Sequence, residues 1–295
     1  DAPTISVSGG DTEISVTFTN PSDVGGGAIT SYTATAIASG VSTGATSATS
    51  PVTITGLTND TSYSVTGLAN NAFGSSPYST ATSSSPAAAV GIRFAGEGSA
   101  AKLNVIDKIN IGTTGNATDF GDTSATRDRV SSGGNSTRGL VAGGREDSTQ
   151  YVVTIEYITF ASASNTTDFG DLTSARRKMA SMTSSTRSIF GAGELQTYYG
   201  NTDTIDYVTT ASTGNAIDFG DTSEDRSNMA GFSSTTRGVM GGGYGDTSES
   251  GTAQDEIFYI TMASTGNTSD FGDLLAANYA LAGLADATRG VFGGG

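Results

Sequence analysis

A sequence repeat of about fifty residues constrains this chain more than any other feature. The tetrapeptide Asp-Phe-Gly-Asp occurs four times, at intervals of 49, 50 and 52 residues, beginning at Asp119, Asp168, Asp218 and Asp270. A unit that returns so regularly folds as one supersecondary element stacked on its neighbours, because a single unit is too small to bury an apolar face alone. We therefore predict a repeat architecture for the larger part of the chain.

Two further elements recur at the same spacing. Thr-Arg-Gly or Thr-Arg-Ser runs into an apolar pair and glycines, at Thr137, Thr186, Thr236 and Thr288. A strand-like segment precedes each Asp-Phe-Gly-Asp, at residues 105–109, 154–158, 204–208 and 256–260. Each unit thus holds several short strand patterns and glycine-rich turns but no convincing helix, at the repeat length typical of propeller blades of four strands.

The order of these elements resembles the kelch repeat. A glycine-rich apolar strand, a variable loop, an Ile-Glu-Tyr-like strand and a Phe strand are followed by a basic residue, as at Arg176 and Arg177. Kelch blades normally carry Trp where this chain has Phe120, Phe169, Phe219 and Phe271. The resemblance implies an all-β, kelch-like β-propeller over residues 91–295 with four recognisable blades. A solenoid or an open β array is the alternative.

The glycine-rich strand is found once more than the Asp-Phe-Gly-Asp element. Phe94-Ala95-Gly96 matches it, which makes five copies against four. Because a closed ring holds equal numbers of both, either residues 91–96 overlap with the C-terminal strand at the ring closure or the natural chain continues with further blades. We expect the chain to continue beyond Gly295, and we expect its opening at Asp1 to be that of a mature product or an excerpt.

The first 85 residues carry a different pattern. Segments 14–18, 32–36, 52–54 and 63–65 alternate between apolar and polar residues and are separated by turn residues, which predicts a β-sandwich. Together with Ala2-Pro3 and the stretch from Gly56 to Tyr63, they resemble a fibronectin type III module. The resemblance places Phe18 where such modules usually carry Trp, and Tyr63 at a tyrosine corner. Residues 1–85 are then a sandwich that acts more often as a spacer than as a receptor, and 86–90 a linker.

Composition excludes several kinds of chemistry. The chain has 14 Lys and Arg against 29 Asp and Glu, a formal net charge of −15, and neither Cys nor His. A Ser-His-Asp triad, a thiol nucleophile, a disulfide framework and a His/Cys zinc site are therefore impossible. The acidic balance argues against nucleic-acid binding, and no apolar run approaches a membrane span. We expect no enzyme and no cofactor.

The recurring residues suggest structural roles, because active sites are asymmetric constellations. We expect the four phenylalanines to form blade cores and the aspartates to form turns. Four recurring arginines are expected to pair with these aspartates, with a ligand-binding ring as the alternative: Arg138, Arg187, Arg237 and Arg289. Calcium is a candidate ligand of Asp119, Asp122 and their equivalents, but the spacing lacks a full oxygen cage and we expect no metal there.

The loops that differ most between copies are the candidate binding region. They span residues 145–152, 194–202 and 244–255, and they offer flat aromatic surfaces suited to sugars or proteins at Tyr151, Tyr198, Tyr199 and Tyr244. Variable loops on a repeated scaffold commonly carry specificity. Unconstrained surface variation explains the same diversity.

The wording of the repeats resembles that of structural proteins of tailed bacteriophages, especially those of marine bacteria. Phrases such as Thr-Gly-Asn-Ala-Thr-Asp-Phe-Gly-Asp carry the resemblance. It implies a virion-surface protein, a tail fibre or fibre-associated subunit, that forms a homo-oligomer, binds other virion proteins and contacts a host-surface glycan or protein. The alternatives are a capsid or tail decoration protein and a bacterial surface or secreted adhesin. A carbohydrate hydrolase with paired acids is the enzyme hypothesis.

Overall fold

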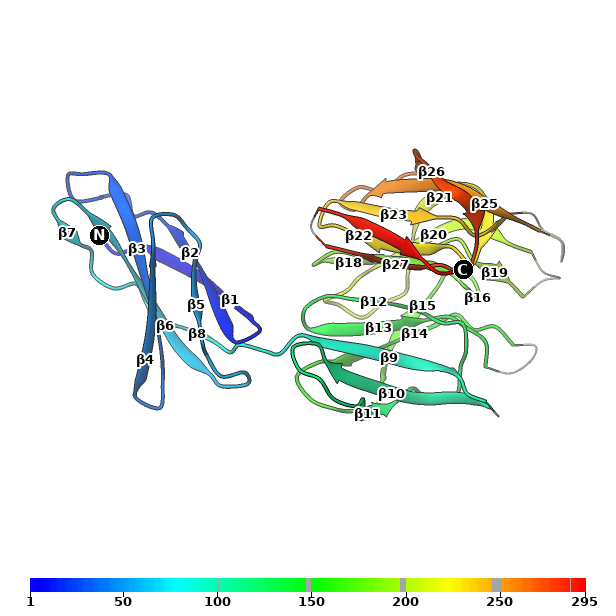
Figure 1. The fold of residues 1–295 in the computed structure, drawn as a ribbon, viewed down its shortest axis with the longest axis horizontal. Helices are drawn as coiled ribbons and strands as arrows, with labels where there is room; N and C mark the ends of the chain where they lie inside the picture. The colour runs from blue at the N-terminus through cyan, green and yellow to red at the C-terminus, as the bar shows by residue number, and fades with distance from the viewer. Residues whose placement is uncertain (100, 147–149, 197–199, 246–250, 287) are drawn as a thin grey trace. The chain divides into compact units, whose positions relative to one another are not determined.

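The computed structural model describes residues 1–295 except 100, 147–149, 197–199, 246–250 and 287. All regular structure in the described residues is β, and none of these residues lies in a helix, as predicted (Figure 1). The chain divides into two compact units, Asp1–Gly91 with Ile109–Ala117, and Ile92–Lys108 with Thr118–Gly295.

The first unit contains two antiparallel sheets. One has the order β1-β2-β5 and the other the order β4-β3-β6-β7, with β8 also paired to β6. The strands are β1 (Thr4–Gly10), β2 (Glu13–Thr19), β3 (Ile29–Ala38), β4 (Val41–Ser47), β5 (Val52–Thr55), β6 (Tyr63–Asn71), β7 (Gly74–Ser75) and β8 (Thr82–Ser84). Alternate residues of these strands are buried, as the period of two in the sequence predicted.

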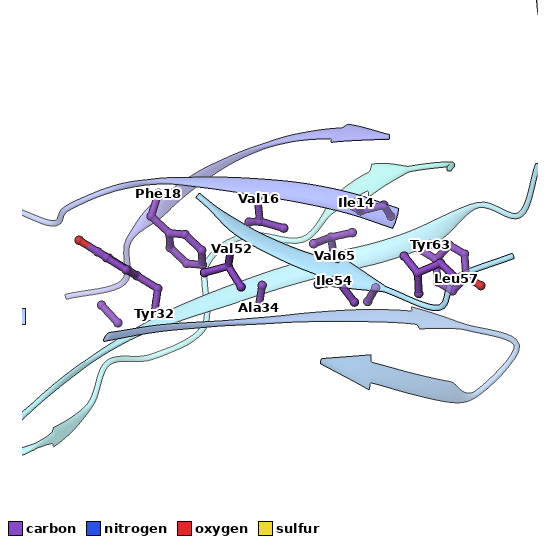
Figure 2. Close-up of a cluster of buried hydrophobic side chains, with 12 residues drawn as sticks. Ile14, Val16, Phe18, Tyr32, Ala34, Val52, Ile54, Leu57, Tyr63 and Val65 are labelled. Atoms are coloured by element: carbon purple, nitrogen blue, oxygen red, sulfur yellow. The ribbon is translucent and has the colours of Figure 1, made fainter. Parts of the chain in front are cut away.

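The core of this sandwich lies between the two sheets (Figure 2). Each fully buried aliphatic or aromatic side chain contributes about 1.5–3 kcal/mol to stability. The Phe18 ring packs on Tyr32 at 4.8 Å between centroids, and a Cβ at Gly67 would collide with it, so the chain accommodates this anchor by having glycine opposite. The Tyr63 hydroxyl accepts the N–H of Thr58 at 3.0 Å, which confirms the predicted tyrosine corner.

The second unit repeats one antiparallel meander. Its complete quartets run in the order first, second, third and fourth strand, and each strand pairs with the next. The second repeat has β12 (Ser131–Gly134), β13 (Arg138–Ala142), β14 (Thr154–Thr159) and β15 (Thr167–Asp171). The third has β17 (Ala180–Thr183), β18 (Arg187–Gly191), β20 (Thr202–Thr209) and β21 (Ile217–Ser227). The fourth has β22 (Ala230–Ser233), β23 (Arg237–Gly241), β25 (Thr252–Thr261) and β26 (Ser269–Asn278).

The repeats at the two ends are partial in the described strands. The first has β9 (Val90–Glu97), β10 (Lys102–Asn110) and β11 (Thr118–Asp122), equivalent to the second, third and fourth strands. After β26 come β27 (Ala282–Ala285) and β28 (Gly290–Gly293), equivalent to a first and a second strand. Three short strands lie between quartet strands: β16 (Arg176–Arg177), β19 (Glu194–Leu195) and β24 (Tyr244–Gly245).

The first strands of consecutive repeats lie side by side. β12 neighbours β17, β17 neighbours β22, and β22 neighbours β27. Small residues permit this approach: a Cβ at Gly231 would lie within 3 Å of the Ser181 backbone, and the Ser233 hydroxyl donates to Thr183 O at 2.6 Å. This packing shows how repeats rich in Gly, Ser and Ala bury one another. None of the described sheets closes on itself, so the closed propeller remains a prediction.

Candidate functional site

The Asp-Phe-Gly-Asp motif forms a β-bulge in the fourth strand of each repeat. In β11, Gly121 pairs with Ile106 and Asp119 with Asp107, so that Phe120 has no partner across the ladder. Gly121 has a φ of +148°, and its N–H donates to Asp119 Oδ1 at 3.1 Å. The same register shift recurs at Phe169, Phe219 and Phe271. The first aspartate thus makes the side-chain bond of an Asx turn, as a turn former does, but it does so in a bulge inside a strand and not in a loop between strands.

The bulge turns the phenylalanine into the space between repeats. Phe120, Phe169 and Phe219 are only 2–3 % exposed, as a core role requires, whereas Phe271 is 52 % exposed. The described residues contain only the first two strands of the repeat that follows Phe271, so the core role expected of Phe271 stays a prediction. Phe169 and Phe219 also contact the tyrosine of the adjacent third strand edge-on, with ring centroids 5.9 and 5.8 Å apart.

An asparagine of each following repeat is hydrogen-bonded to this bulge. The N–H of Asp122 donates to Asn165 Oδ1 at 3.1 Å, and the N–H of Thr166 donates back to Asp122 O at 2.9 Å. Asn215 and Asn267 make the same bond, at 3.1 Å, to the next two fourth strands. A Cβ at Gly121, Gly170 or Gly220 would lie within 3 Å of the arriving turn, so this close approach requires glycine. We call this contact the joint.

The arginines of the Thr-Arg elements do not pair with the recurring aspartates. The guanidinium groups of three of them stack on tyrosines of the adjacent third strand at 4.4–4.7 Å from the ring centroids: Arg138 on Tyr157, Arg187 on Tyr207 and Arg237 on Tyr259. Arg289 is exposed, and the structure shows it in no ion pair with the described aspartates. The expected pairing is wrong because the third strand lies between these arginines and the motif strand.

A second set of arginines makes the buried ion pairs. Arg127, Arg176 and Arg226 follow the first aspartate of their motif by eight residues, and all three are fully buried. Arg176 Nη2 lies 2.6 Å from Asp206 Oδ2 on the third strand of the next repeat, and its Nη1 donates to the carbonyls of Ala192 and Thr204. Burial lowers the pKa of Arg176, although the Asp206 charge opposes the shift.

We call this ion pair between a buried arginine and a carboxylate of the next repeat the bolt. The other two joints contain one bolt each. Arg127 binds Glu156, and Arg226 Nη2 lies 2.8 Å from Glu256 Oε2. A charge this deeply buried is tolerated only when it is paired, so these arginines tie each repeat to the next. The sequence contains a signal for these pairs, an arginine eight residues after the first aspartate of three of the four motifs.

The variable loops and the turns between repeats meet at one edge of the unit. We call residues 127–130, 144–146, 176–179, 193–195, 226–229 and 243–245 the loop edge. Lys178 N–H donates to Arg129 O, Asn228 N–H to Lys178 O, and Ala280 N–H to Asn228 O, at 3.0–3.1 Å. This ladder runs from repeat to repeat through residues with φ of +55 to +58°. It holds the bases of the variable loops in fixed positions.

Two clusters of charged groups lie on the loop edge. Asp128 accepts two bonds from Arg145, at 3.0 and 2.7 Å, and also lies 3.6 Å from Lys102. Burial raises the pKa of Asp128, but the Arg145 hydrogen bonds and charge outweigh it, and the pKa lies below its ordinary value. Because cations satisfy the carboxylate, this cluster is a structural support and not an acid–base pair.

The second cluster includes one of the predicted binding tyrosines. Glu194 contacts Arg177, lies 2.6 Å from Lys178 Nζ and accepts the Tyr151 hydroxyl at 2.5 Å. Burial raises the pKa of Glu194, but the hydrogen bonds from Lys178, Tyr151 and Arg177 lower it to about 2. Burial and the Glu194 bond raise the pKa of Tyr151 to about 12. The Arg177 guanidinium covers the Tyr151 ring at 4.5 Å.

The structure places only part of the predicted tyrosine set. Tyr244 lies on the loop edge and packs against Tyr279 at 4.1 Å between centroids. Tyr151 and Tyr244 are half-buried, so each has one side committed to the protein and another facing outward. Tyr198 and Tyr199 lie outside the described residues.

Two carboxyls and one pocket are the further described features that bear on acid–base chemistry. Asp221 and Asp225 are the described carboxyls with raised pKa values, through burial and the neighbouring Asp203. They do not line the pocket of about 220 Å³ on the first unit, which Asp23, Asn71 and other residues form. Within the described ranges no three acidic side chains gather to hold a metal ion, and no helix long and apolar enough to cross a membrane is found.

Comparison with known proteins identifies the first unit. No curated protein matches the chain. The sequence profile of the fibronectin type III domain matches residues 1–85. The two sheets, the buried Phe18 and the tyrosine corner of Tyr63 agree with that match. Residues 1–85 are a fibronectin type III domain.

Proposed function

We propose that this chain is a non-enzymatic attachment protein of a virion surface, a tail fibre or fibre-associated subunit. The fibronectin type III domain acts as a spacer, and the loop edge of the repeats contacts a host-surface glycan or protein. The observation that carries this proposal is the loop edge itself: loops of different sequence rise from bases held by one repeated backbone ladder. A rigid support with interchangeable loops is how repeat scaffolds create binding surfaces.

The proposal includes a specific fold for the repeats, a kelch-like β-propeller. Four-stranded antiparallel quartets whose first strands lie side by side support it, as do the buried phenylalanines of the first three bulges. The resemblance of the repeats to structural proteins of tailed bacteriophages supports the virion assignment. A capsid or tail decoration protein and a bacterial surface or secreted adhesin are the alternatives.

A binding experiment tests the role of the loop edge. Purified protein is incubated with intact host cells, and the bound fraction is measured for the natural chain and for Tyr151→Ala. Tyr78→Ala is the matched control, because Tyr78 is 61 % exposed on the fibronectin domain, far in sequence from the loop edge. We expect Tyr151→Ala to weaken binding and Tyr78→Ala to leave it unchanged. Equal binding by all three proteins, or none by any, contradicts the proposal.

Immunogold electron microscopy distinguishes the alternatives. Antibodies against the purified chain are applied to phage particles and to host cells. Label at the distal fibres supports attachment, label over the capsid or tail shaft indicates a decoration protein, and label on cells alone indicates an adhesin.

A further inference from the structure

Basic side chains gather at the first two turns of the loop edge, residues 127–130 and 176–179. Apart from the bolt arginines, five of the 14 Lys and Arg residues of the chain lie around two carboxylates there: Lys102, Arg129 and Arg145 around Asp128, and Arg177 and Lys178 around Glu194. The whole chain has twice as many acids as bases, so this grouping is a local reversal of its charge.

The excess of positive charge falls at Arg129 and Lys178. These residues occupy equivalent positions of the backbone ladder: the Lys178 N–H donates to Arg129 O at 3.1 Å, and their φ angles are +55° and +58°. The next position of the ladder is neutral, Asn228. Two repeats in succession therefore place a cation at the same step, and like charges at adjacent steps repel each other.

Arg129 is incompletely paired. Its Nε lies 3.6 Å from Asp128 Oδ2, its side chain is 39 % exposed, and its guanidinium makes no hydrogen bond with the described residues. Asp128 already accepts two bonds from Arg145, and Glu97 adds its negative charge at Arg145. The donors of Arg129 are thus left for a group from outside.

The charge of Arg129 acts on Lys178. Burial lowers the pKa of Lys178, the bond and charge of Glu194 oppose this shift, and the charges of Arg177 and Arg129 add to it. An anion bound by both Arg129 and Lys178 would remove their repulsion. A guanidinium also matches the two oxygens of a carboxylate better than it matches a single acceptor atom.

An aromatic ring lies beside these cations. Tyr151 and Lys178 share one carboxylate, since the Tyr151 hydroxyl donates to Glu194 Oε1 at 2.5 Å and Lys178 Nζ lies 2.6 Å from Oε2. The guanidinium of Arg177 covers the Tyr151 ring, and Tyr151 is half-buried, so the ring is held in place. A fixed aromatic ring next to charged groups suits a sugar, which has an apolar ring face and polar substituents.

The third turn of the loop edge, residues 226–229, has the opposite charge beside it. Glu224 and Asp225 come directly before this turn, and burial and the charge of Asp203 raise the pKa of Asp225. Ser227 and Asn228 stand where the second turn has Arg177 and Lys178. An extended polyanion along the whole edge would meet these acids, so the cations suit a single acidic sugar unit better than a nucleic acid.

We propose that Arg129, Lys178 and Tyr151 form a binding site for a carboxylate-bearing sugar of an acidic glycan. The inference rests on the proposed attachment function and names the ligand class of the loop edge. The sugar carboxylate binds Arg129 and Lys178, and the sugar ring packs against Tyr151. Glu194 holds Lys178 and Tyr151 in position.

Calorimetric titration of the purified chain with acidic oligosaccharides tests this proposal. The probes are oligomers of galacturonate, mannuronate and sialate, each compared with its uncharged methyl ester. We expect at least one acid to bind, its ester to bind about tenfold more weakly or less, and Arg129→Gln to weaken binding of the acid about tenfold. Asp128 keeps Arg145 and Lys102 in this variant, so circular dichroism should show a folded protein.

Arg237→Gln is the matched control. It removes the same charge from an exposed arginine at the start of β23, whereas the loop edge follows the end of that strand. We expect it to leave binding unchanged. An equal loss in Arg237→Gln and Arg129→Gln indicates a response to net charge and overturns the proposal.

The proposal is also overturned when none of the acids binds, when acids and esters bind equally, or when Arg129→Gln binds as the natural chain does. The titration uses no host cells. A chain that attaches to cells but binds no acidic sugar refutes this inference and leaves the attachment function standing. A chain that binds the sugars but not the cells refutes the attachment function instead.

Discussion

Replacing Arg176 by Met is the sharpest perturbation of the repeat joint. The substitution keeps most of the side-chain volume and removes the cation 2.6 Å from Asp206, a carboxylate with no exposed surface. The amide and hydroxyl of Thr173 still bind Asp206, but they carry no charge. Breaking one side of a buried pair costs about 3–5 kcal/mol, a large share of the about 5–15 kcal/mol that stabilises a typical domain.

Hydrogen exchange followed by mass spectrometry measures this loss where it occurs. A local loss of about 3–5 kcal/mol accelerates exchange of the amides in β18 and β20 between about a hundredfold and a few thousandfold. Amides of the fibronectin domain in the same sample provide the internal reference. We expect Arg187→Met to have a much smaller effect of about 0.5–1 kcal/mol, because Arg187 only stacks on Tyr207 and donates to a carbonyl.

The double variant Arg176→Met with Asp206→Leu separates charge from packing. Because it removes both charges, we expect it to recover most of the protection lost in Arg176→Met. The fourth repeat already has an apolar residue, Phe258, at the position of Asp206. Unchanged exchange in Arg176→Met, or a double variant as damaged as the single one, would refute the bolt as a buried ion pair.

Three further outcomes follow from the structure. The pKa of Glu194 is about 2 in the folded protein against an ordinary 4.5. The ionised Glu194 should therefore stabilise the folded protein fully above about pH 4.5, and this stabilisation should be lost as the pH falls toward 2. Urea midpoints measured against pH should lose this dependence in Glu194→Gln. Gly170→Ala should destabilise the repeats, because its Cβ would meet the Gly214 backbone at a φ of +146°. Gly266→Ala, with a φ of +156° but nothing within 4 Å of its Cβ, should cost less in thermal unfolding. Tyr63→Phe should cost about 1 kcal/mol in the fibronectin transition alone, since it removes only the bond from Thr58.

The sequence predicted those features that depend on local pattern. Alternation within strands and the spacing of turn residues were enough for the sandwich, because each strand buries every second residue. The period of the motif was enough for the repeat. The bulge was not predicted, because a residue that drops out of a ladder looks the same in sequence as one in a turn: Asp-Phe-Gly-Asp reads as a turn until Gly121 is seen opposite Ile106.

The pairing of charges was harder to predict than the strands. The Arg138 set recurs in four repeats and the Arg176 set in three, and only the Arg138 set was expected to contact carboxylates. What separates them is the sheet order, which puts Arg138 beside a tyrosine of its own repeat and Arg176 over the third strand of the next. Spacing along one chain does not contain that information, because the partner is set by stacking between repeats.

The arginine–carboxylate contact is kept in repeats where the residues that make it stand at different positions. In the fourth repeat Phe258 occupies the acid position, Arg226 stacks over its ring at 4.9 Å, and the carboxylate stands two residues earlier at Glu256. Residues two apart in a strand share a face, so the acid still reaches the guanidinium after this shift. In the first repeat Asp107 stays in place and the arginine moves, to Arg93. The Arg93–Asp107 pair is partly exposed, whereas the buried Arg226 keeps a carboxylate in reach because an unpaired charge is the one arrangement that a buried joint between repeats does not tolerate.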